Sequence, residues 1–165
     1  MKKLLLLLIV CLLCGCANTN SGPQKPISFF YITRTADYEP GQTLIRQKTV
    51  DATDLGASSE DILRAYLQGP VDDPELETPF PAGTELVSTR QSGDVLIVTL
   101  SSQFAQLSGI HLSVACDCIT KTCLPLFDAQ IIRIRAYGNT LDGAEYIEMD
   151  AESVLLLDIV IPESE

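Results

Sequence analysis

The chain has 165 residues, of which 46% are hydrophobic and 20% charged, a composition typical of one packed globular domain. Its formal net charge is −11, because 22 acidic residues outnumber 11 basic ones. Such a surface repels nucleic-acid phosphates and anionic lipid headgroups, and the sequence has no basic run to override this, so we expect no nucleic-acid partner.

The N-terminus carries a pattern that directs proteins to a membrane. Two lysines precede an unbroken apolar run over residues 4–13. This run is shorter than the roughly 20 residues that a permanent transmembrane helix needs, and a charged head before such a run is typical of a secretory signal peptide. The sequence Leu-Cys-Gly-Cys at 13–16 then resembles the lipobox of bacterial lipoproteins, in which the last cysteine is lipidated.

We therefore expect residues 1–15 to be removed as a signal peptide and Cys16 to carry a lipid at the new N-terminus. The alternatives are an ordinary signal peptide cut nearby or an uncleaved anchor. Residues 16–26 are mostly polar, contain Gly and Pro, and are expected to form a flexible tether. A multiply acylated terminus is held stably in a bilayer, so the predicted location is the extracytoplasmic face of the cell membrane.

The first part of the domain that follows predicts two strands and a helix. Residues 27–33 are aromatic and β-branched and residues 43–50 alternate moderately, so we expect two paired strands on either side of a Pro-Gly turn. Residues 59–68 place apolar side chains at helical spacing, and Ser58 with Asp61 forms a capping-box pattern at the start. A Gly-Pro pair then ends this helix.

The second part predicts a hairpin, a longer helix and two more strands. Residues 85–90 and 95–100 flank a Gln-Ser-Gly-Asp turn, and the run Val-Leu-Ile-Val at 95–98 is apolar on both faces, which indicates a central strand. The remaining predicted elements are a helix at 107–124 that Pro125 ends, strands at 130–136 and 154–161, and an acidic tail at 162–165.

The order β-β-α-β-β-α-β-β describes an α+β fold. We expect a single compact domain over residues 27–161, with two amphipathic helices packed on one face of a mixed, mainly antiparallel sheet. The helical crossovers allow some of its strands to pair in parallel.

Three cysteines in the second predicted helix are candidates for a disulfide, a metal site or packing. Cys116 and Cys123 would lie roughly 10 Å apart along a helix axis, too far for a disulfide. The spacing of Cys116 and Cys118 is tighter than the usual zinc pair. We therefore expect packed thiols without a metal, and we expect Asp117 and Lys121 to lie in solvent on the opposite face.

Catalytic patterns are weak in this sequence. His111 is the only histidine and stands near the start of a predicted core-facing helix, and no G-x-S-x-G motif places a nucleophile. The loop at 71–83 carries four acids that lack the spacing of a calcium loop and are expected to be solvated, namely Asp72, Asp73, Glu75 and Glu77. We expect neither an enzyme nor a cofactor.

Arg133 and Arg135 fall on one face of the strand predicted at 130–136. On so acidic a chain we expect them to pair with neighbouring carboxylates rather than to form an anion site. Interfaces depend on a few anchors, among which arginine is common, so these two residues are our candidates for contact with a partner.

Several segments together resemble the GerMN domain family, which is named for a sporulation and spore germination lipoprotein. They are ILRAYLQGP, TPFPAGTELVSTRQSGDVLIVTLSSQF, LSGIHLSVACDCITKT and IIRIRAYG. The family pattern is a helix ending in Gly-Pro, a loop reaching Pro-x-Gly-Thr, a hairpin followed by Ser and Phe, and a Thr-rich second helix. The matching positions are Leu67, Gly69, Pro70, Pro81, Gly83, Thr84, Phe104 and Thr122.

The resemblance implies a non-enzymatic domain similar to ring-building modules, which use sheet and helix surfaces for protein contacts or self-association. The family's namesake carries two copies, whereas this chain carries one. The expected function is that of a membrane-anchored scaffold of the cell envelope, of sporulation or of germination. The alternative is a lipoprotein that binds a small ligand or a cell-wall fragment. A pocket with convergent polar groups would favour the ligand, and a flat apolar patch would favour protein contacts.

Overall fold

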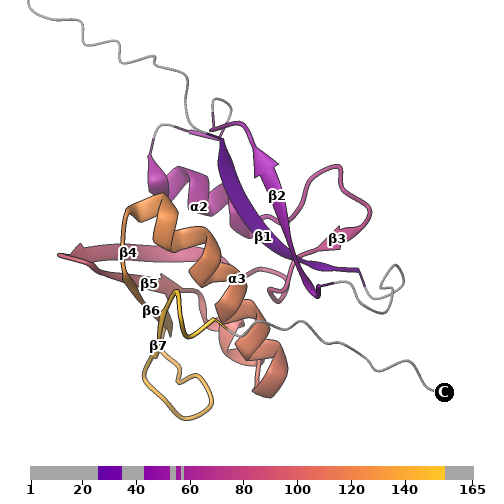
Figure 1. The fold of residues 1–165 in the computed structure, drawn as a ribbon. Helices are drawn as coiled ribbons and strands as arrows, with labels where there is room; N and C mark the ends of the chain where they lie inside the picture. The colour runs from indigo at the N-terminus through magenta and orange to yellow at the C-terminus, as the bar shows by residue number, and fades with distance from the viewer. Residues whose placement is uncertain (1–25, 35–42, 53–54, 57, 155–165) are drawn as a thin grey trace, which may run out of the picture.

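The structure is a computed structural model, and it describes residues 26–34, 43–52, 55–56 and 58–154. Within these residues the chain forms two β-sheets with two α-helices between them (Figure 1). The small sheet has the order β2-β1-β3 and the large sheet the order β4-β5-β6-β7. The strands are β1 (Ile27–Thr33), β2 (Ile45–Val50), β3 (Leu76–Glu77), β4 (Leu86–Ser92), β5 (Val95–Leu100), β6 (Ile131–Ala136) and β7 (Ile147–Asp150). The helices are α2 (Ser59–Leu67), the short 3₁₀ helix η3 (Ser102–Gln106) and α3 (Gly109–Phe127).

The strand pairings confirm most of the sequence-based prediction. β1 pairs with β2 and β4 pairs with β5, both antiparallel, and β5 lies between β4 and β6 as expected of a central strand. β5 and β6 run parallel because α3 connects them as a crossover. The α+β class is therefore confirmed. The strands divide into two sheets rather than one, because α3 lies between β1 and the large sheet.

Helix α2 begins and ends where its local signals place it. Ser58 accepts a hydrogen bond from the backbone N–H of Asp61 at 3.2 Å, and its hydroxyl also bonds the Asp61 carboxylate at 2.7 Å. Gly69 follows the helix with φ of +94°, a left-handed conformation that side chains other than glycine rarely adopt. Arg64 ties α2 to the large sheet by donating to the carbonyl oxygen of Leu86 at 2.9 Å.

Helix α3 is longer than predicted at one end. The prediction that Pro125 ends it was wrong, because the helix continues to Phe127 and closes at Asp128, whose φ is +52°. Proline removes one backbone hydrogen bond from the last turn. Leu126 and Phe127 nevertheless pack against the core, and this contact holds the final turn in place.

The polar face expected on α3 was also mispredicted. Asp117 is completely buried and Lys121 is half-buried, so this side of the helix does not lie in solvent. α3 contacts β1 on one side and β6 and β7 on the other, which leaves little of its circumference exposed. Thr120 illustrates the packing toward the large sheet, since its hydroxyl lies 3.5 Å from the sulfur of Met149 on β7.

Two short strands were not predicted. β3 pairs with β1 at Ile32 and Thr33, and β7 pairs with β6 at the edge of the large sheet. The strand predicted at 154–161 and the acidic tail at 162–165 lie outside the described residues except for Val154, which is buried in a bend.

Candidate interaction surfaces

The outer face of the large sheet is not covered by a described helix. Alternate residues of β5 and β6 point inward and are fully buried against the helices, namely Leu96, Val98, Leu100, Ile132 and Ile134. Because successive side chains of a strand point to opposite faces, the residues between them point outward. Val95, Ile97 and Ile131 lie on this outer face and are half-buried, so its centre is apolar.

One row of paired residues crosses the outer face from edge to edge. Arg90 pairs with Ile97, Ile97 with Arg133, and Arg133 with Glu148. Arg133 Nε donates to Glu148 Oε2 at 2.6 Å, and this hydrogen bond raises the pKa of the guanidinium. The row therefore places an apolar side chain between two arginines, one of which is fixed by an acidic partner.

Tyr146 lies beside both predicted arginines. Its ring centre is 5.1 Å from the guanidinium carbon of Arg133 and 5.5 Å from that of Arg135, distances typical of cation–π contacts. Arg135 also forms an ion pair of 3.1 Å with Glu145. The prediction that Arg133 and Arg135 share one face and pair with nearby carboxylates is confirmed. Tyr146 was not singled out, because it precedes a strand that the sequence did not predict.

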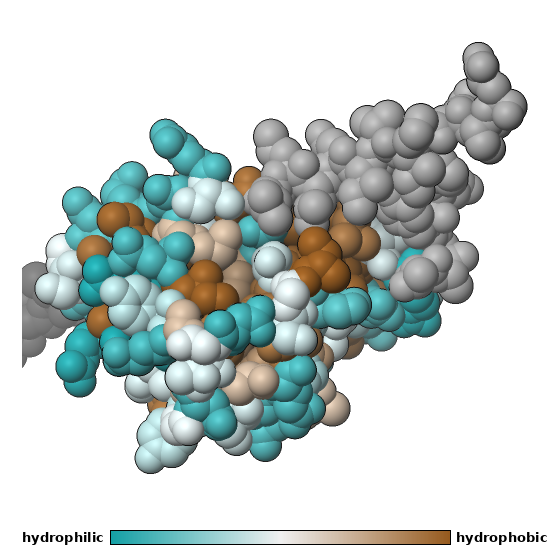
Figure 2. Space-filling view, turned by 90° about the horizontal axis from the view of Figure 1, so that it is seen from below, coloured by the Kyte–Doolittle hydropathy of each residue, from teal (hydrophilic) through white to brown (hydrophobic). Residues whose placement is uncertain are grey.

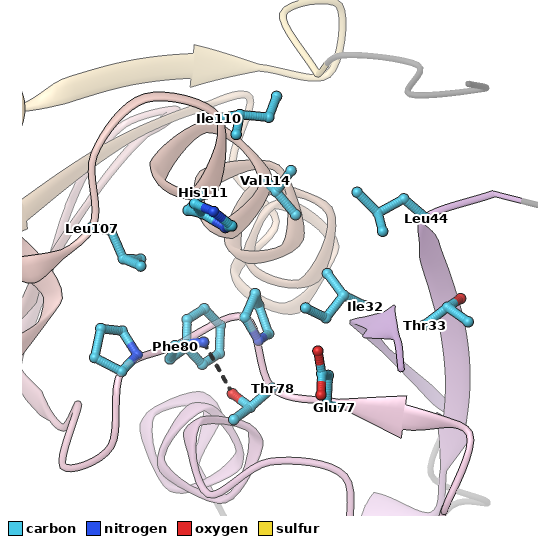
Figure 3. Close-up of a pocket in the computed structure, with 12 residues that line it drawn as sticks. Ile32, Thr33, Leu44, Glu77, Thr78, Phe80, Leu107, Ile110, His111 and Val114 are labelled. Atoms are coloured by element: carbon cyan, nitrogen blue, oxygen red, sulfur yellow. Dashed lines mark hydrogen bonds between the residues drawn. The ribbon is translucent and has the colours of Figure 1, made fainter. Parts of the chain in front are cut away.

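A groove opens between the small sheet, the loop after β3 and the start of α3 (Figure 3). Its volume is about 430 Å³ and its lining is mainly apolar. Figure 3 shows Val114 and His111 of α3 on one side and Ile32 and Phe80 on the other. Ile110, at its rim, is 56% exposed. The lining residues are Ile32, Thr33, Leu44, Glu77, Thr78, Pro79, Phe80, Pro81, Leu107, Ile110, His111 and Val114.

His111 was expected on a core-facing helix, and this is only partly right. The helix is buried, but His111 stands in its first turn with an exposed side chain at the groove. Near the groove's other side, Thr78 accepts a hydrogen bond from the backbone N–H of Phe80 at 3.3 Å. Two ionisable side chains, His111 and Glu77, therefore border a groove whose other lining residues are uncharged and mainly apolar.

Apolar surface is distributed in patches rather than over one whole face. In Figure 2, brown apolar side chains alternate with teal and white polar ones around shallow hollows. Among the described large apolar residues, four are exposed at several places in the chain, namely Val71, Val87, Ile110 and Tyr137.

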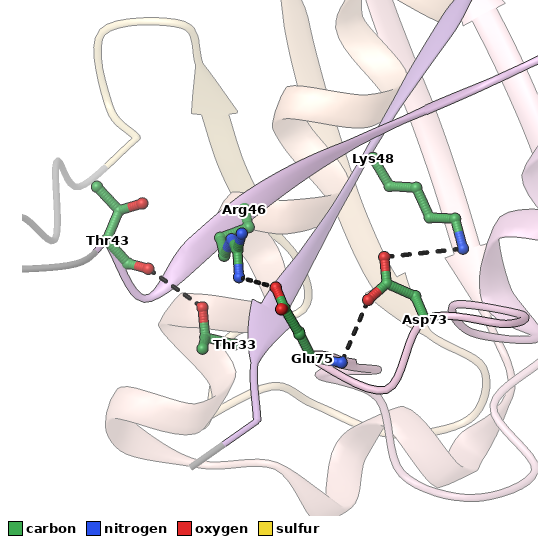
Figure 4. Close-up of polar contacts among 6 residues, drawn as sticks. All are labelled: Thr33, Thr43, Arg46, Lys48, Asp73 and Glu75. Atoms are coloured by element: carbon green, nitrogen blue, oxygen red, sulfur yellow. Dashed lines mark hydrogen bonds and ion pairs between the residues drawn. The ribbon is translucent and has the colours of Figure 1, made fainter. Parts of the chain in front are cut away.

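The acidic loop is held by basic residues of β2 (Figure 4). Arg46 donates to Glu75 at 2.8 Å, and Lys48 lies 4.0 Å from Asp73. Asp73 in turn accepts the backbone N–H of Glu75 at 3.2 Å. Within the described part of the chain no three His, Cys, Asp or Glu side chains gather as metal ligands would. Two of the four acids in this loop, Asp73 and Glu75, thus form ion pairs with β2.

The three described cysteines are buried and free. Burial raises the pKa of the Cys116 thiol from 9.0 to about 12. The pKa values of Cys118 and Cys123 are also raised well above the ordinary range, chiefly by burial. The raised pKa values keep these thiols protonated at neutral pH, and the thiolate is the reactive form of cysteine. The prediction that they pack in the helix is confirmed.

α3 is the one described helix whose length and apolar composition would suffice for a membrane span. More than half of that stretch is buried inside the domain, and a core helix meets the same criterion. Cys16 and the residues before it, to which the predicted anchor belongs, lie outside the described residues.

The positions that carry the family resemblance have defined structural roles. Leu67 and Phe104 are buried in the core. The loop Pro-Ala-Gly-Thr is closed by Thr84, whose hydroxyl and backbone N–H donate to the carbonyl oxygen of Pro81 at 2.8 and 3.1 Å. Thr122 accepts the backbone N–H of Phe30 at 3.1 Å. These residues maintain the fold and do not converge on a reactive centre.

Solved structures with the same fold include GerMN domains. The tandem GerMN domains of the sporulation protein GerM from Bacillus subtilis superpose with a TM-score of 0.57 at 15% identity, covering 86% of this chain and 50% of that one. The first GerMN domain of the same protein gives 0.55 at 14% identity, covering 77% and 96%. The chain thus spans half the length of the tandem structure.

A Clostridium perfringens protein described as a lipoprotein shares 22% identity over 85% of this chain and 95% of that one, but its TM-score of 0.47 is too low to support an argument. A search of the curated proteins returned no relative. The profile of the Germane family, described as sporulation and spore germination, matches residues 29–142, which is more than half of the chain. The chain therefore belongs to the Germane family, as the GerMN motifs in its sequence predicted.

Proposed function

We propose that this protein is a lipid-anchored, extracytoplasmic interaction module without catalytic activity, and that it acts in the cell envelope during sporulation or germination. Family membership supports the biological setting. The lipobox-like sequence at 13–16 supports the anchor, with Cys16 as the lipidated residue. The partner is a protein, either another envelope component or a second copy of the chain.

The outer face of the large sheet is the observation that carries this proposal. Its centre holds the apolar side chains Val95, Ile97 and Ile131, and two arginines and a tyrosine border them. Protein interfaces have such apolar centres and are enriched in Tyr and Arg. The ion pairs of Arg133 and Arg135 hold both guanidiniums in place before a partner arrives, which lowers the entropy lost on binding.

The test reverses the charges of this face while preserving its ion pairs. Arg133→Glu combined with Glu148→Arg, and Arg135→Glu combined with Glu145→Arg, are expressed in a deletion strain at matched levels. We expect both pairs of changes to weaken crosslinked capture of the partner and to impair complementation, with unchanged thermal unfolding. Truncating an interface anchor typically costs about 2 kcal/mol or more of binding free energy, roughly a thirtyfold loss of affinity.

Matched controls lie away from this face. Asp72→Ala and His111→Ala should leave capture and complementation unchanged. If either control abolishes function in a protein that still folds and reaches the membrane, the sheet face is not the working surface.

A second candidate function is the binding of a small apolar ligand. The groove at the start of α3 supports it, since about 430 Å³ is enough for a small molecule. Its mainly apolar lining suits an apolar molecule better than a polar cell-wall fragment. Fluorescence of anilinonaphthalene sulfonate, compared between the native protein and Ile110→Glu, tests whether this groove takes up an apolar probe.

A further inference from the structure

A second groove lies along the later part of α3, away from the sheet face discussed above. Its volume is about 350 Å³ and its lining is mainly apolar. Two elements form it, the last turns of α3 and the bend that follows β7. The lining residues are Thr120, Lys121, Leu124, Pro125, Ala151, Glu152 and Val154.

The chain itself enters this groove. After β7, the carboxylate of Asp150 accepts the backbone N–H groups of Glu152 and Ser153 at 3.0 and 2.7 Å and the Ser153 hydroxyl at 2.6 Å. These bonds fix the bend over residues 150–153 and place Val154 after it. Val154, the last described residue, is 9% exposed, belongs to the core cluster and lines the groove.

The sequence that follows Val154 needs burial. Six of the seven residues at 155–161, Leu-Leu-Leu-Asp-Ile-Val-Ile, are apolar. Each fully buried Leu, Ile or Val side chain stabilises a fold by about 1.5–3 kcal/mol relative to exposure. At roughly 3.3 Å per residue, an extended segment starting in the groove reaches about 13 Å by the fourth residue, enough to follow α3 over more than two turns.

The groove is lined by one basic and one acidic residue, Lys121 on α3 and Glu152 in the bend, and the Lys121 end is complementary to the charge of the segment. Asp158 is the single charged residue of the segment. Lys121 is the single basic side chain among the described lining residues, and its Nζ lies 5.6 Å from the ring centre of Phe30 on β1. A carboxylate in an apolar environment requires a partner, and Lys121 is the cation that the described lining of the groove offers.

We propose that residues 155–161 dock into this groove as an intramolecular strap, which runs from Val154 along α3 toward β1 with Asp158 against Lys121. The strap completes the core between the two sheets. The proposal is independent of the interaction surface on the large sheet.

The test is a charge exchange read by hydrogen exchange and thermal unfolding of the full chain. Lys121→Glu and Asp158→Lys alone should each speed amide exchange within 155–161 by about tenfold or more and lower Tm. The combined variant should restore both readouts. Glu165→Lys is the matched control, and it should change neither. The proposal would be overturned if the amides of 155–161 exchanged freely in the native chain. It would also be overturned if the effects of Lys121→Glu and Asp158→Lys on Tm simply added in the combined variant.

Truncation after Val154 provides a second measurement. The truncated chain should bind anilinonaphthalene sulfonate more strongly, and a synthetic peptide of residues 155–165 added in trans should reverse this. Absence of any increase would contradict docking. If protection of 155–161 appeared only at concentrations at which the full chain dimerises, the segment would dock into the groove of a neighbouring copy. That result would overturn the intramolecular strap.

Discussion

Tyr31 of β1 and Tyr66 of α2 join their two elements by hydrogen bonds that run in both directions. The Tyr31 hydroxyl donates to the carbonyl oxygen of Tyr66 at 3.0 Å, and the Tyr66 hydroxyl donates to the carbonyl oxygen of Phe30 at 2.8 Å. Their ring centres are 5.1 Å apart. On this edge of β1, β3 pairs only with Ile32 and Thr33, so Phe30 has no strand partner there. Its backbone N–H and carbonyl oxygen bond instead to side chains of the helices, Thr122 and Tyr66.

The first prediction concerns the hydrogen bond from Tyr66 to Phe30. Tyr66→Phe removes the donor to Phe30 and leaves a partly buried carbonyl unsatisfied, so we expect the free energy of unfolding to fall by about 1–2 kcal/mol. Urea denaturation measures this. Tyr137→Phe is the control, because Tyr137 is 66% exposed and its loss of a hydroxyl should be neutral. Equal stability of Tyr66→Phe and wild type would show that water replaces the bond.

The second prediction concerns the other backbone group of Phe30. Thr122→Val keeps the size of the side chain but removes the oxygen that accepts the Phe30 N–H, so it should cost about 1–3 kcal/mol of unfolding free energy. Hydrogen exchange should speed up at the Phe30 amide in particular. Thr140→Val, at an exposed position, serves as the comparison. Unchanged protection at Phe30 would contradict the assigned role.

The third prediction concerns thiol reactivity. Because burial keeps Cys116, Cys118 and Cys123 protonated, the folded protein should resist alkylation by N-ethylmaleimide at pH 8 at all three positions. Unfolding in urea should make all three react within minutes. Mass spectrometry of the peptides that contain them separates these thiols from those at the N-terminus. Rapid native labelling of any of them would mean that α3 opens readily.

The fourth prediction concerns alkaline pH. The Cys116 thiol has its pKa raised from 9.0 to about 12 in the folded chain, so the folded state binds this proton more tightly than the unfolded state. Its contribution is therefore complete below pH 9 and is lost as pH rises toward 12. Each such thiol can make the free energy of unfolding fall by up to about 1.4 kcal/mol per pH unit in this range. Urea titrations from pH 7 to 11 should show a plateau and then a decline, which Cys116→Ala makes shallower.

The fifth prediction concerns the anchor. If Cys16 is lipidated, Cys16→Ala should abolish labelling by a fatty-acid analogue and release the protein from the membrane fraction. Cys14→Ala provides a comparison, since that residue would leave with the signal peptide. Equal labelling of Cys16→Ala and wild type would exclude this site of acylation.

Local signals were enough to place α2 and the hairpin. Ser58 and Asp61 act within one helical turn, and Gly69 needs only its own backbone freedom, so their effect does not depend on the rest of the fold. The Gly93 turn joins β4 and β5 in the same way. β3 and β7 are too short to show a recognisable alternation of apolar and polar residues in the sequence. They form strands because they pair with β1 and β6.

The candidate surface was partly visible in the sequence. Alternation along one strand placed Arg133 and Arg135 on the same face, because the period of a strand is two residues. Arg90, Ile97 and Tyr146 come from other strands and loops, and the register of the large sheet brings them together. Nothing in single-strand periodicity specifies that register.

The sequence by itself determined the family, the α+β class, the helix boundaries with local caps and the burial of the three cysteines, because these depend on short-range chemistry and on apolar spacing. The tertiary structure alone decided how α3 is enclosed. A helix between two sheets buries most of its circumference, so Asp117 is buried although it stands on the polar side of the pattern, and the last turn persists beyond Pro125 because Leu126 and Phe127 have a core to pack against.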